Sequence, residues 1–213
     1  MKTLSAETLS QMGGRMLPMF AMRNIGTDSF YRTGFEKLYF EADHEKMSEV
    51  LISSVIPFDG ELLIVGDSEM CKMWRMLCHK MSISVSVIDG QDTENEIDAA
   101  MTAIMESNKR IKHVICSGAR SAESLSIIGR LSKKYRCALI VDNCTDVLSM
   151  ADVDRYGIDF LIGSSNDDLS VILARRSKLV QTEGNARNAS QDLYAMWQDD
   201  MRQRRPTLEP MAC

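Results

Sequence analysis

The sequence has few residues of the kinds that build metal sites. Its 213 residues include only three histidines, and none of its six cysteines stands in a CxxC pair. Zinc sites in proteins use closely spaced Cys and His ligands, so we expect no metal site. Cys116 and Cys137 lie within apolar runs that read as strands, and we interpret both as buried free thiols.

The chain also lacks a positive charge excess and any long apolar run. Its net charge is −5, which provides no basic field for nucleic acid or an anionic membrane surface. No apolar stretch approaches the length that spans a bilayer, and residues 1–7 lack the apolar core of a signal peptide. We therefore expect a cytoplasmic protein that binds neither nucleic acid nor membrane.

What is present is the composition of a globular domain, with 45% hydrophobic and 26% charged residues. Strand and helix patterns alternate along residues 61–174, which predicts an α/β fold with a mostly parallel sheet flanked by helices. The predicted strands are 61–66, 83–88, 111–116, 137–141, 159–162 and 169–174. The connection between the last two is so short that they should form an antiparallel hairpin.

The predicted helices carry apolar stripes at helical spacing. One stripe comprises Met70, Met73, Trp74, Leu77, Cys78 and Met81, a second Ile97, Ala100, Met101, Ile104 and Met105, and a third Leu125, Ile128 and Leu131. Ser68 and Ser121 are suited to cap the first and third of these helices.

The chain divides by pattern into three parts. Residues 1–58 form an N-terminal segment in which we predict helices over 6–12 and 44–56 with an irregular stretch between them. Residues 59–187 form the α/β core, and residues 188–213 form a tail with a helix over 192–202 that ends before Pro206.

Several motifs of this core resemble the class V aminotransferases. The strand Cys137–Asp142, the segment Asp152–Ile162 and the stretch from Gly184 to Trp197 carry the resemblance, which is strongest to the 2-aminoethylphosphonate–pyruvate transaminase subfamily. The resemblance implies the large domain of a fold-type I enzyme dependent on pyridoxal phosphate, here without the C-terminal small domain. It also implies an oligomer, since members of the family are dimers.

The departures fall on the residues that perform the family's chemistry. The family turn that ends in the cofactor-binding lysine reads Asn166-Asp167-Asp168 here, so a carboxylate replaces the amine. The family's glycine-containing phosphate loop corresponds to Glu41–Met47, which has acidic groups and no glycine. We therefore expect no covalent cofactor.

Two retained residues are candidates for noncovalent contact with pyridoxal phosphate. By resemblance Asp142 would bind the pyridinium nitrogen and Asn166 would lie near the phosphate. The alternatives are that Asp142 caps a turn or the following helix and that Asn166 is an ordinary turn residue. Asp167 and Asp168 could form a carboxylate pair, but adjacent residues in a turn usually point apart. Arg187 is interpreted as tying the tail to the core.

Three functions remain open at this level. The first is a degenerate, non-catalytic homologue of the transaminase that acts through protein–protein contact, as a homodimer or as a hetero-oligomer with an intact transaminase. The second is a noncovalent binder of pyridoxal phosphate or another small anion, or a reduced enzyme. The third is a product with no selected activity.

Overall fold

The fold is built on a seven-stranded sheet. The computed structural model describes residues 34–41, 43–66, 68–89, 93–118, 121–142, 150–164 and 169–204. The strand order is β1-β7-β6-β5-β4-β2-β3. All pairs from β3 to β6 are parallel, and β7 is antiparallel to both of its neighbours. The strands are β1 (Phe35–Glu41), β2 (Glu61–Gly66), β3 (Ser84–Asp89), β4 (Ile111–Ser117), β5 (Ala138–Asp142), β6 (Phe160–Ser164) and β7 (Leu169–Arg175).

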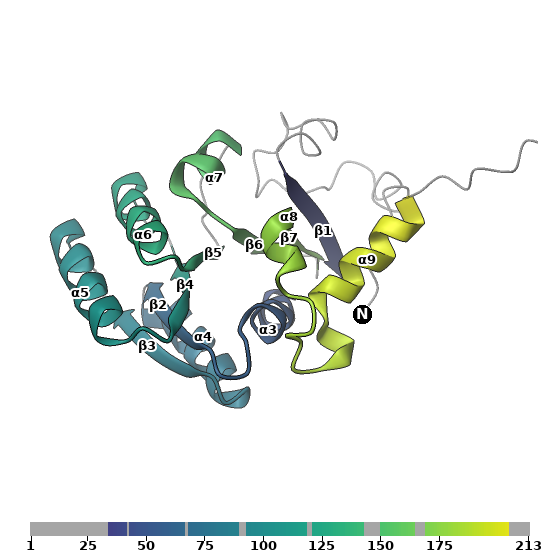
Figure 1. Cartoon of the computed structure of the whole chain (residues 1–213), viewed down its shortest axis with the longest axis horizontal. Coiled ribbons are helices and arrows are strands. Elements are labelled where there is room, and N and C mark those ends of the chain that lie inside the picture. The colour runs from purple at the N-terminus through teal and green to yellow at the C-terminus, as the bar shows by residue number, and fades with distance from the viewer. Residues whose placement is uncertain are drawn as a thin grey trace, which may run out of the picture.

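Helices cover both faces of this sheet (Figure 1). One face carries α3 (His44–Val55), α4 (Ser68–Lys80) and α9 (Leu193–Arg204), which share one apolar cluster with alternate residues of the strands. The other face carries α5 (Glu94–Ser107), α6 (Ala122–Lys134) and α7 (Met150–Tyr156). A short helix α8 (Arg176–Val180) and a 3-10 turn (Ala189–Gln191) lead into α9. The predicted α/β fold with a mostly parallel sheet is confirmed.

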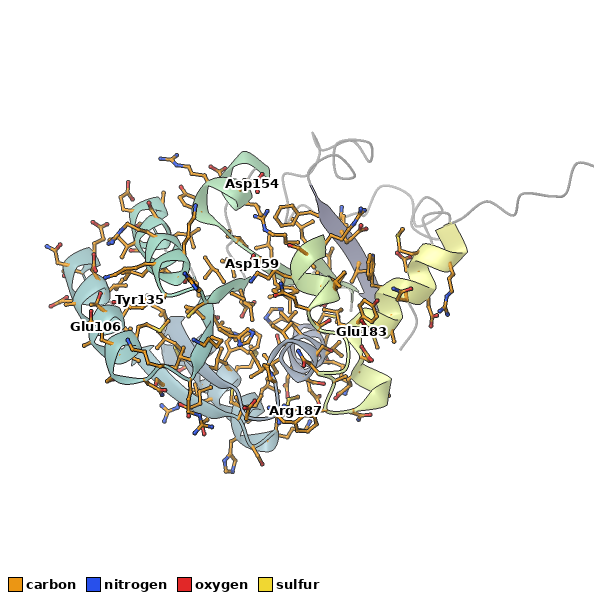
Figure 2. The ribbon with its side chains drawn as sticks, viewed as in Figure 1. Glu106, Tyr135, Asp154, Asp159, Glu183 and Arg187 are labelled. Carbon is orange, nitrogen blue, oxygen red and sulfur yellow. The ribbon has the colours of Figure 1, made fainter. Side chains whose placement is uncertain are left out.

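Arg187 fastens the segment before α9 to the rest of the molecule (Figure 2). Its guanidinium donates to the carbonyl oxygens of Pro57 at 2.7 Å and Met81 at 3.3 Å, and it lies over the ring of Phe58. The backbone N–H of Arg187 also donates to the carbonyl of Ser53. The expected structural role of this arginine is therefore seen in its contacts.

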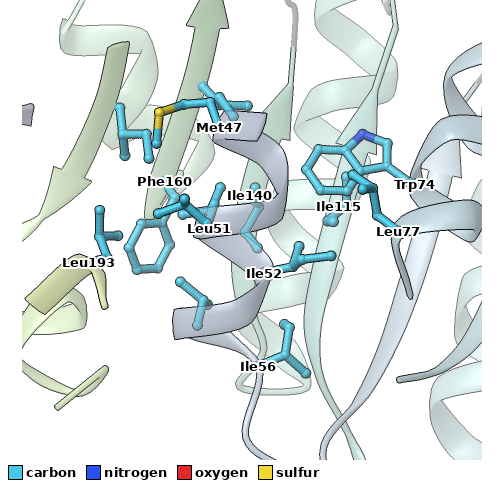
Figure 3. Packing of buried hydrophobic residues seen from close by; sticks show 14 of the residues in the cluster. Met47, Leu51, Ile52, Ile56, Trp74, Leu77, Ile115, Ile140, Phe160 and Leu193 are labelled. Carbon is cyan, nitrogen blue, oxygen red and sulfur yellow. The ribbon is translucent and has the colours of Figure 1, made fainter. Parts of the chain in front are cut away.

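The core on the α3 face is built around α3 itself (Figure 3). Met47, Leu51 and Ile52 are fully buried between the sheet and the neighbouring helices. They belong to one cluster with Ile140 and Phe160 of the central strands. This helix thus fixes the position of its own first residue, His44, against the sheet.

Most of the predicted local patterns are confirmed. The buried apolar residues of α5 and α6 fall on the predicted stripes, and so do Trp74, Leu77 and Cys78 of α4, where Cys71 is buried as well. β5 is buried along its whole length, and β6 and β7 form the expected hairpin. Ser121 caps α6 by accepting from the backbone N–H of Ser124. Cys116 and Cys137 are both buried, as expected, and burial raises the pKa of Cys137 to about 11.

Two local predictions are wrong, and one falls outside the described residues. Residues 35–41, expected to be irregular, form β1. The hydrogen bonds of this strand come from its pairing with β7, which the local sequence pattern does not predict. Ser68 is the first residue of α4 and not the residue before it. The helix predicted over 6–12 lies outside the described residues.

Candidate functional site

The carboxyl ends of the parallel strands bring together the polar side chains of the first candidate site. Asp142 is the last residue of β5 and Ser117 the last of β4, and the two are register partners in the parallel ladder. Such partners present their side chains on the same face of a sheet. Open α/β sheets bind ligands at this edge, so the predicted residue Asp142 lies where a ligand site is expected.

Asp142 is completely buried and surrounded by donors from its own chain. Its Oδ2 accepts from Nε1 of Trp74 at 2.7 Å and from Oγ of Ser117 at 2.9 Å. The same Nε1 also lies 3.1 Å from Oγ of Ser117, so the indole N–H is shared between the two acceptors. A buried carboxylate needs such donors, because its desolvation is otherwise very costly.

His44 supplies the third contact to this carboxylate. Its Nε2 lies 2.8 Å from Oδ1 of Asp142, although the two atoms are not aligned as a regular hydrogen bond. Burial lowers the pKa of His44, but the Asp142 carboxylate and the nearby charge of Asp43 outweigh it, so the pKa is raised above its ordinary value. The pair is therefore an ion pair whenever the imidazole is protonated.

The start of α3 explains why His44 points at Asp142. Asp43 caps this helix by accepting from the backbone N–H of Lys46 at 2.7 Å, which fixes the first turn. His44 is the first helical residue and only 19% exposed. The stretch Glu41–Met47, which replaces the family's phosphate loop, thus places the imidazole of His44 beside Asp142.

This arrangement does not fit pyridoxal phosphate in the manner that the resemblance implies. A pyridinium nitrogen needs a free oxygen of Asp142, but Oδ2 already accepts two hydrogen bonds and Oδ1 faces His44. The carboxylate has no exposed surface through which a ring could approach. A cofactor could reach Asp142 only if His44 or Trp74 moved away, and the cofactor role of Asp142 stays a prediction.

The structure does not test the other predicted site residues. Asn166, Asp167 and Asp168 lie outside the described residues, so their roles stay predictions. Within the described ranges, no three His, Cys, Asp or Glu side chains gather as a metal-binding group. None of the helices in these ranges is long and apolar enough to cross a membrane.

Sequence reasoning missed three members of the site. Trp74 was assigned to the apolar stripe of its helix, where its ring does pack, and only its N–H has the polar role. His44 stands in the segment interpreted as an altered phosphate loop, and Ser117 directly follows the strand predicted over 111–116. The available signals were a histidine directly after a helix cap and a serine that ends a buried strand.

No family model matches the chain. It is 27% identical over 160 residues to a bifunctional phosphonoacetaldehyde hydrolase/aminoethylphosphonate transaminase of Clostridioides difficile strain 630, covering 70% of this chain and 25% of that protein. It is also 27% identical over 161 residues to a 2-aminoethylphosphonate–pyruvate transaminase of Bacillus mycoides strain KBAB4, covering 70% of this chain and 44% of that protein. The chain thus spans less than half the length of these curated relatives.

The fold is that of the fold-type I aminotransferases. A ureidoglycine–glyoxylate aminotransferase of Bacillus subtilis matches with a TM-score of 0.60 and 13% identity, over 92% of this chain and 56% of that one. Together these matches show a distant homologue of 2-aminoethylphosphonate transaminases with about half of an aminotransferase fold.

Proposed function

We propose that this protein is a non-catalytic relative of the 2-aminoethylphosphonate transaminases that acts through contact with another protein. The observation that carries the non-catalytic part is the engagement of Asp142 by Trp74, Ser117 and His44. Trp74 and Ser117 occupy Oδ2 with hydrogen bonds, and His44 places its imidazole against Oδ1, so side chains of this chain surround both oxygens. The sequence adds Asp167 at the position of the family lysine, and a carboxylate cannot condense with an aldehyde.

The contact part of the proposal is supported by the edge of the sheet. In the described part of the chain, β3 pairs only with β2, and its other side meets no strand. Ser84 on this strand is exposed, and Val85 and Val87 are only partly buried. An edge strand of this kind presents backbone donors and acceptors that another chain can pair with. The partner would be a second copy or an intact transaminase subunit.

The non-catalytic part is tested with the cofactor itself. The purified protein is incubated with pyridoxal phosphate, reduced with borohydride and weighed as the intact chain by mass spectrometry. We expect no stoichiometric adduct, both for the native chain and for Asp167→Lys, because the lysine alone does not free Asp142. An adduct on one lysine of the native protein would overturn the proposal.

The contact part needs its own measurement. Light scattering over a concentration series reports self-association, and capture by an immobilised intact transaminase reports the mixed assembly. The double variant Ser84→Lys/Ser86→Lys should weaken whichever assembly forms, because charged lysines block pairing at a sheet edge. A strictly monomeric protein that the transaminase does not capture would end this part of the proposal.

A further inference from the structure

A cavity lies at the amino ends of the parallel strands, at the opposite end of β5 from Asp142. It is a cavity of about 300 Å³ where β4, β5 and β6 begin, closed on one side by α8 and the turn that follows it. Lys112 and His113 of β4 line it, together with Lys178 of α8. A volume of this size is at the lower end of the range for small-molecule sites.

Three cationic side chains surround this cavity. They are Lys112, Lys178 and Arg136, the last of which precedes β5. Among the residues that the structure describes, none of the three has a carboxylate within ion-pair distance. The ion pairs found among the described residues involve other cations, among them Lys46, Lys80, Arg110 and Arg175. With respect to the described residues, these three cations are therefore available to a ligand.

His113 contributes a partly buried imidazole to the lining of the cavity. Its Nδ1 is buried and has no hydrogen-bond partner among the described residues. Burial, with a contribution from the charge of Lys178, lowers the pKa of His113 to about 4. The imidazole is therefore neutral at pH 7, and a bound anion beside it would favour its protonated form.

Asp159, whose charge interacts with that of Lys178, is engaged by other partners; Figure 2 labels its position. Its Oδ2 accepts from the backbone N–H of Leu139 at 3.1 Å, and its Oδ1 lies 3.4 Å from Nε of Arg175. Burial raises the pKa of Asp159, although these partners and Lys178 oppose the shift. Asp159 thus offsets only part of the positive charge around the cavity.

Arg136 is held in a backbone conformation that favours glycine. Its φ is +57°, and it follows α6 as the left-handed residue of a Schellman turn, in which its N–H donates to Lys133 and that of Cys137 donates to Ser132. An arginine at such a position is strained relative to glycine. Despite this strain, the position carries an arginine whose side chain lines the cavity.

We propose that this cavity binds a small organic phosphate. The dianionic head would lie among Lys112, Arg136 and Lys178, since guanidinium and ammonium groups form strong hydrogen bonds with phosphate. Val55 and Phe160 line the apolar part of the cavity and provide a surface for the carbon body of the ligand. The proposal does not depend on Asp142, which lies at the other end of β5.

The test uses the imidazole NMR signals of His44, His79 and His113 during titration with inorganic phosphate and with phenyl phosphate at constant ionic strength. The signals of His113 should shift saturably and its pKa should rise, because a bound dianion favours the imidazolium. Phenyl phosphate should bind more tightly than inorganic phosphate. Lys112→Met and Lys178→Met should each weaken binding about tenfold or more.

Matched variants separate binding from folding. Lys72→Met, on the surface of α4, should leave the affinity unchanged. Arg136→Gly should weaken binding, whereas Ser82→Gly, at the equivalent left-handed position after α4, should not. Should Lys178→Met fail to fold, the exposed Lys112 decides the question. A native protein without a saturable shift of His113, or a Lys112→Met variant with native affinity, would overturn the proposal.

Discussion

Nε1 of Trp74 donates to Oδ2 of Asp142 across 2.7 Å, although 68 residues separate them in the sequence. Both side chains are fully buried. The bond joins α4 to the end of β5 and stabilises a charge that the interior would otherwise exclude. It therefore links the stability of the domain directly to the state of its candidate site.

Replacing Trp74 by phenylalanine should destabilise the fold by roughly 2–4 kcal/mol. The change removes a donor from a buried carboxylate, which costs about 1.5–3 kcal/mol, and leaves a small cavity as well. Trp197→Phe is the matched control, because Nε1 of Trp197 is buried without a hydrogen-bond partner among the described residues. Urea unfolding should show a much smaller loss for that variant, and equal losses would contradict this account.

The contact between His44 and Asp142 should make stability depend on pH. A histidine whose pKa is raised on folding contributes fully below its unfolded pKa of about 6.5, and the contribution is lost as the pH rises through the folded value. The stability advantage of the native chain over His44→Gln should therefore shrink as the pH rises above about 6.5. Paired unfolding curves at several pH values measure it, and an advantage that grows with pH would refute the ion pair.

Glycine at the two strained turn positions should stabilise the protein. Arg136 and Ser82 have φ values of +57° and +56°, so a glycine at either site relieves the left-handed strain. We expect a gain of about 0.5–1 kcal/mol for each single variant, and additive gains for the pair. Thermal unfolding provides the measurement. A loss of stability at Arg136 alone would mean that its side chain makes contacts that outweigh the strain.

Gly129 should tolerate no side chain. A Cβ at this position would lie 2.1 Å from the backbone oxygen of Tyr156, which is rigid main chain. Alanine normally stabilises a helix relative to glycine by about 1 kcal/mol, but here the clash should reverse the sign and cost roughly 1–3 kcal/mol or more. Ser126→Ala, at an exposed position of the same helix, should be neutral or stabilising. Denaturant midpoints of the two variants distinguish these outcomes.

Much of the fold is readable from local pattern, because a buried face repeats at the period of its element. The spacing of Ile97, Met101 and Met105 predicts the buried face of α5. The apolar run of β5 predicts a strand that is covered on both faces. The local sequence pattern does not predict β1. This strand buries Glu36, whose carboxylate accepts from Nε of Arg176 at 2.7 Å and is also paired with Nη2 of the same side chain. Arg176 directly follows β7.

The candidate site was readable only in part. Position in the family and at a strand end points to Asp142, but the partners that fill its surroundings come from α3, α4 and β4. Whether His44 turns toward the sheet or toward solvent depends on how α3 packs, and local sequence does not contain that information. The same is true of Lys112 and Lys178, which only the packing of α8 below the strands brings to one cavity.

The pairing of β1 with β7 also sets an order of events during synthesis. The two strands are separated by roughly 130 residues of chain, so β1 leaves the ribosome long before its partner exists. At 5–20 residues per second, the delay is on the order of ten seconds. Throughout that interval Phe35 and Leu38, buried in the finished protein, have no sheet to join. Until β7 emerges, β1 is therefore an unpaired strand with exposed apolar side chains, which is the kind of segment that aggregates during folding.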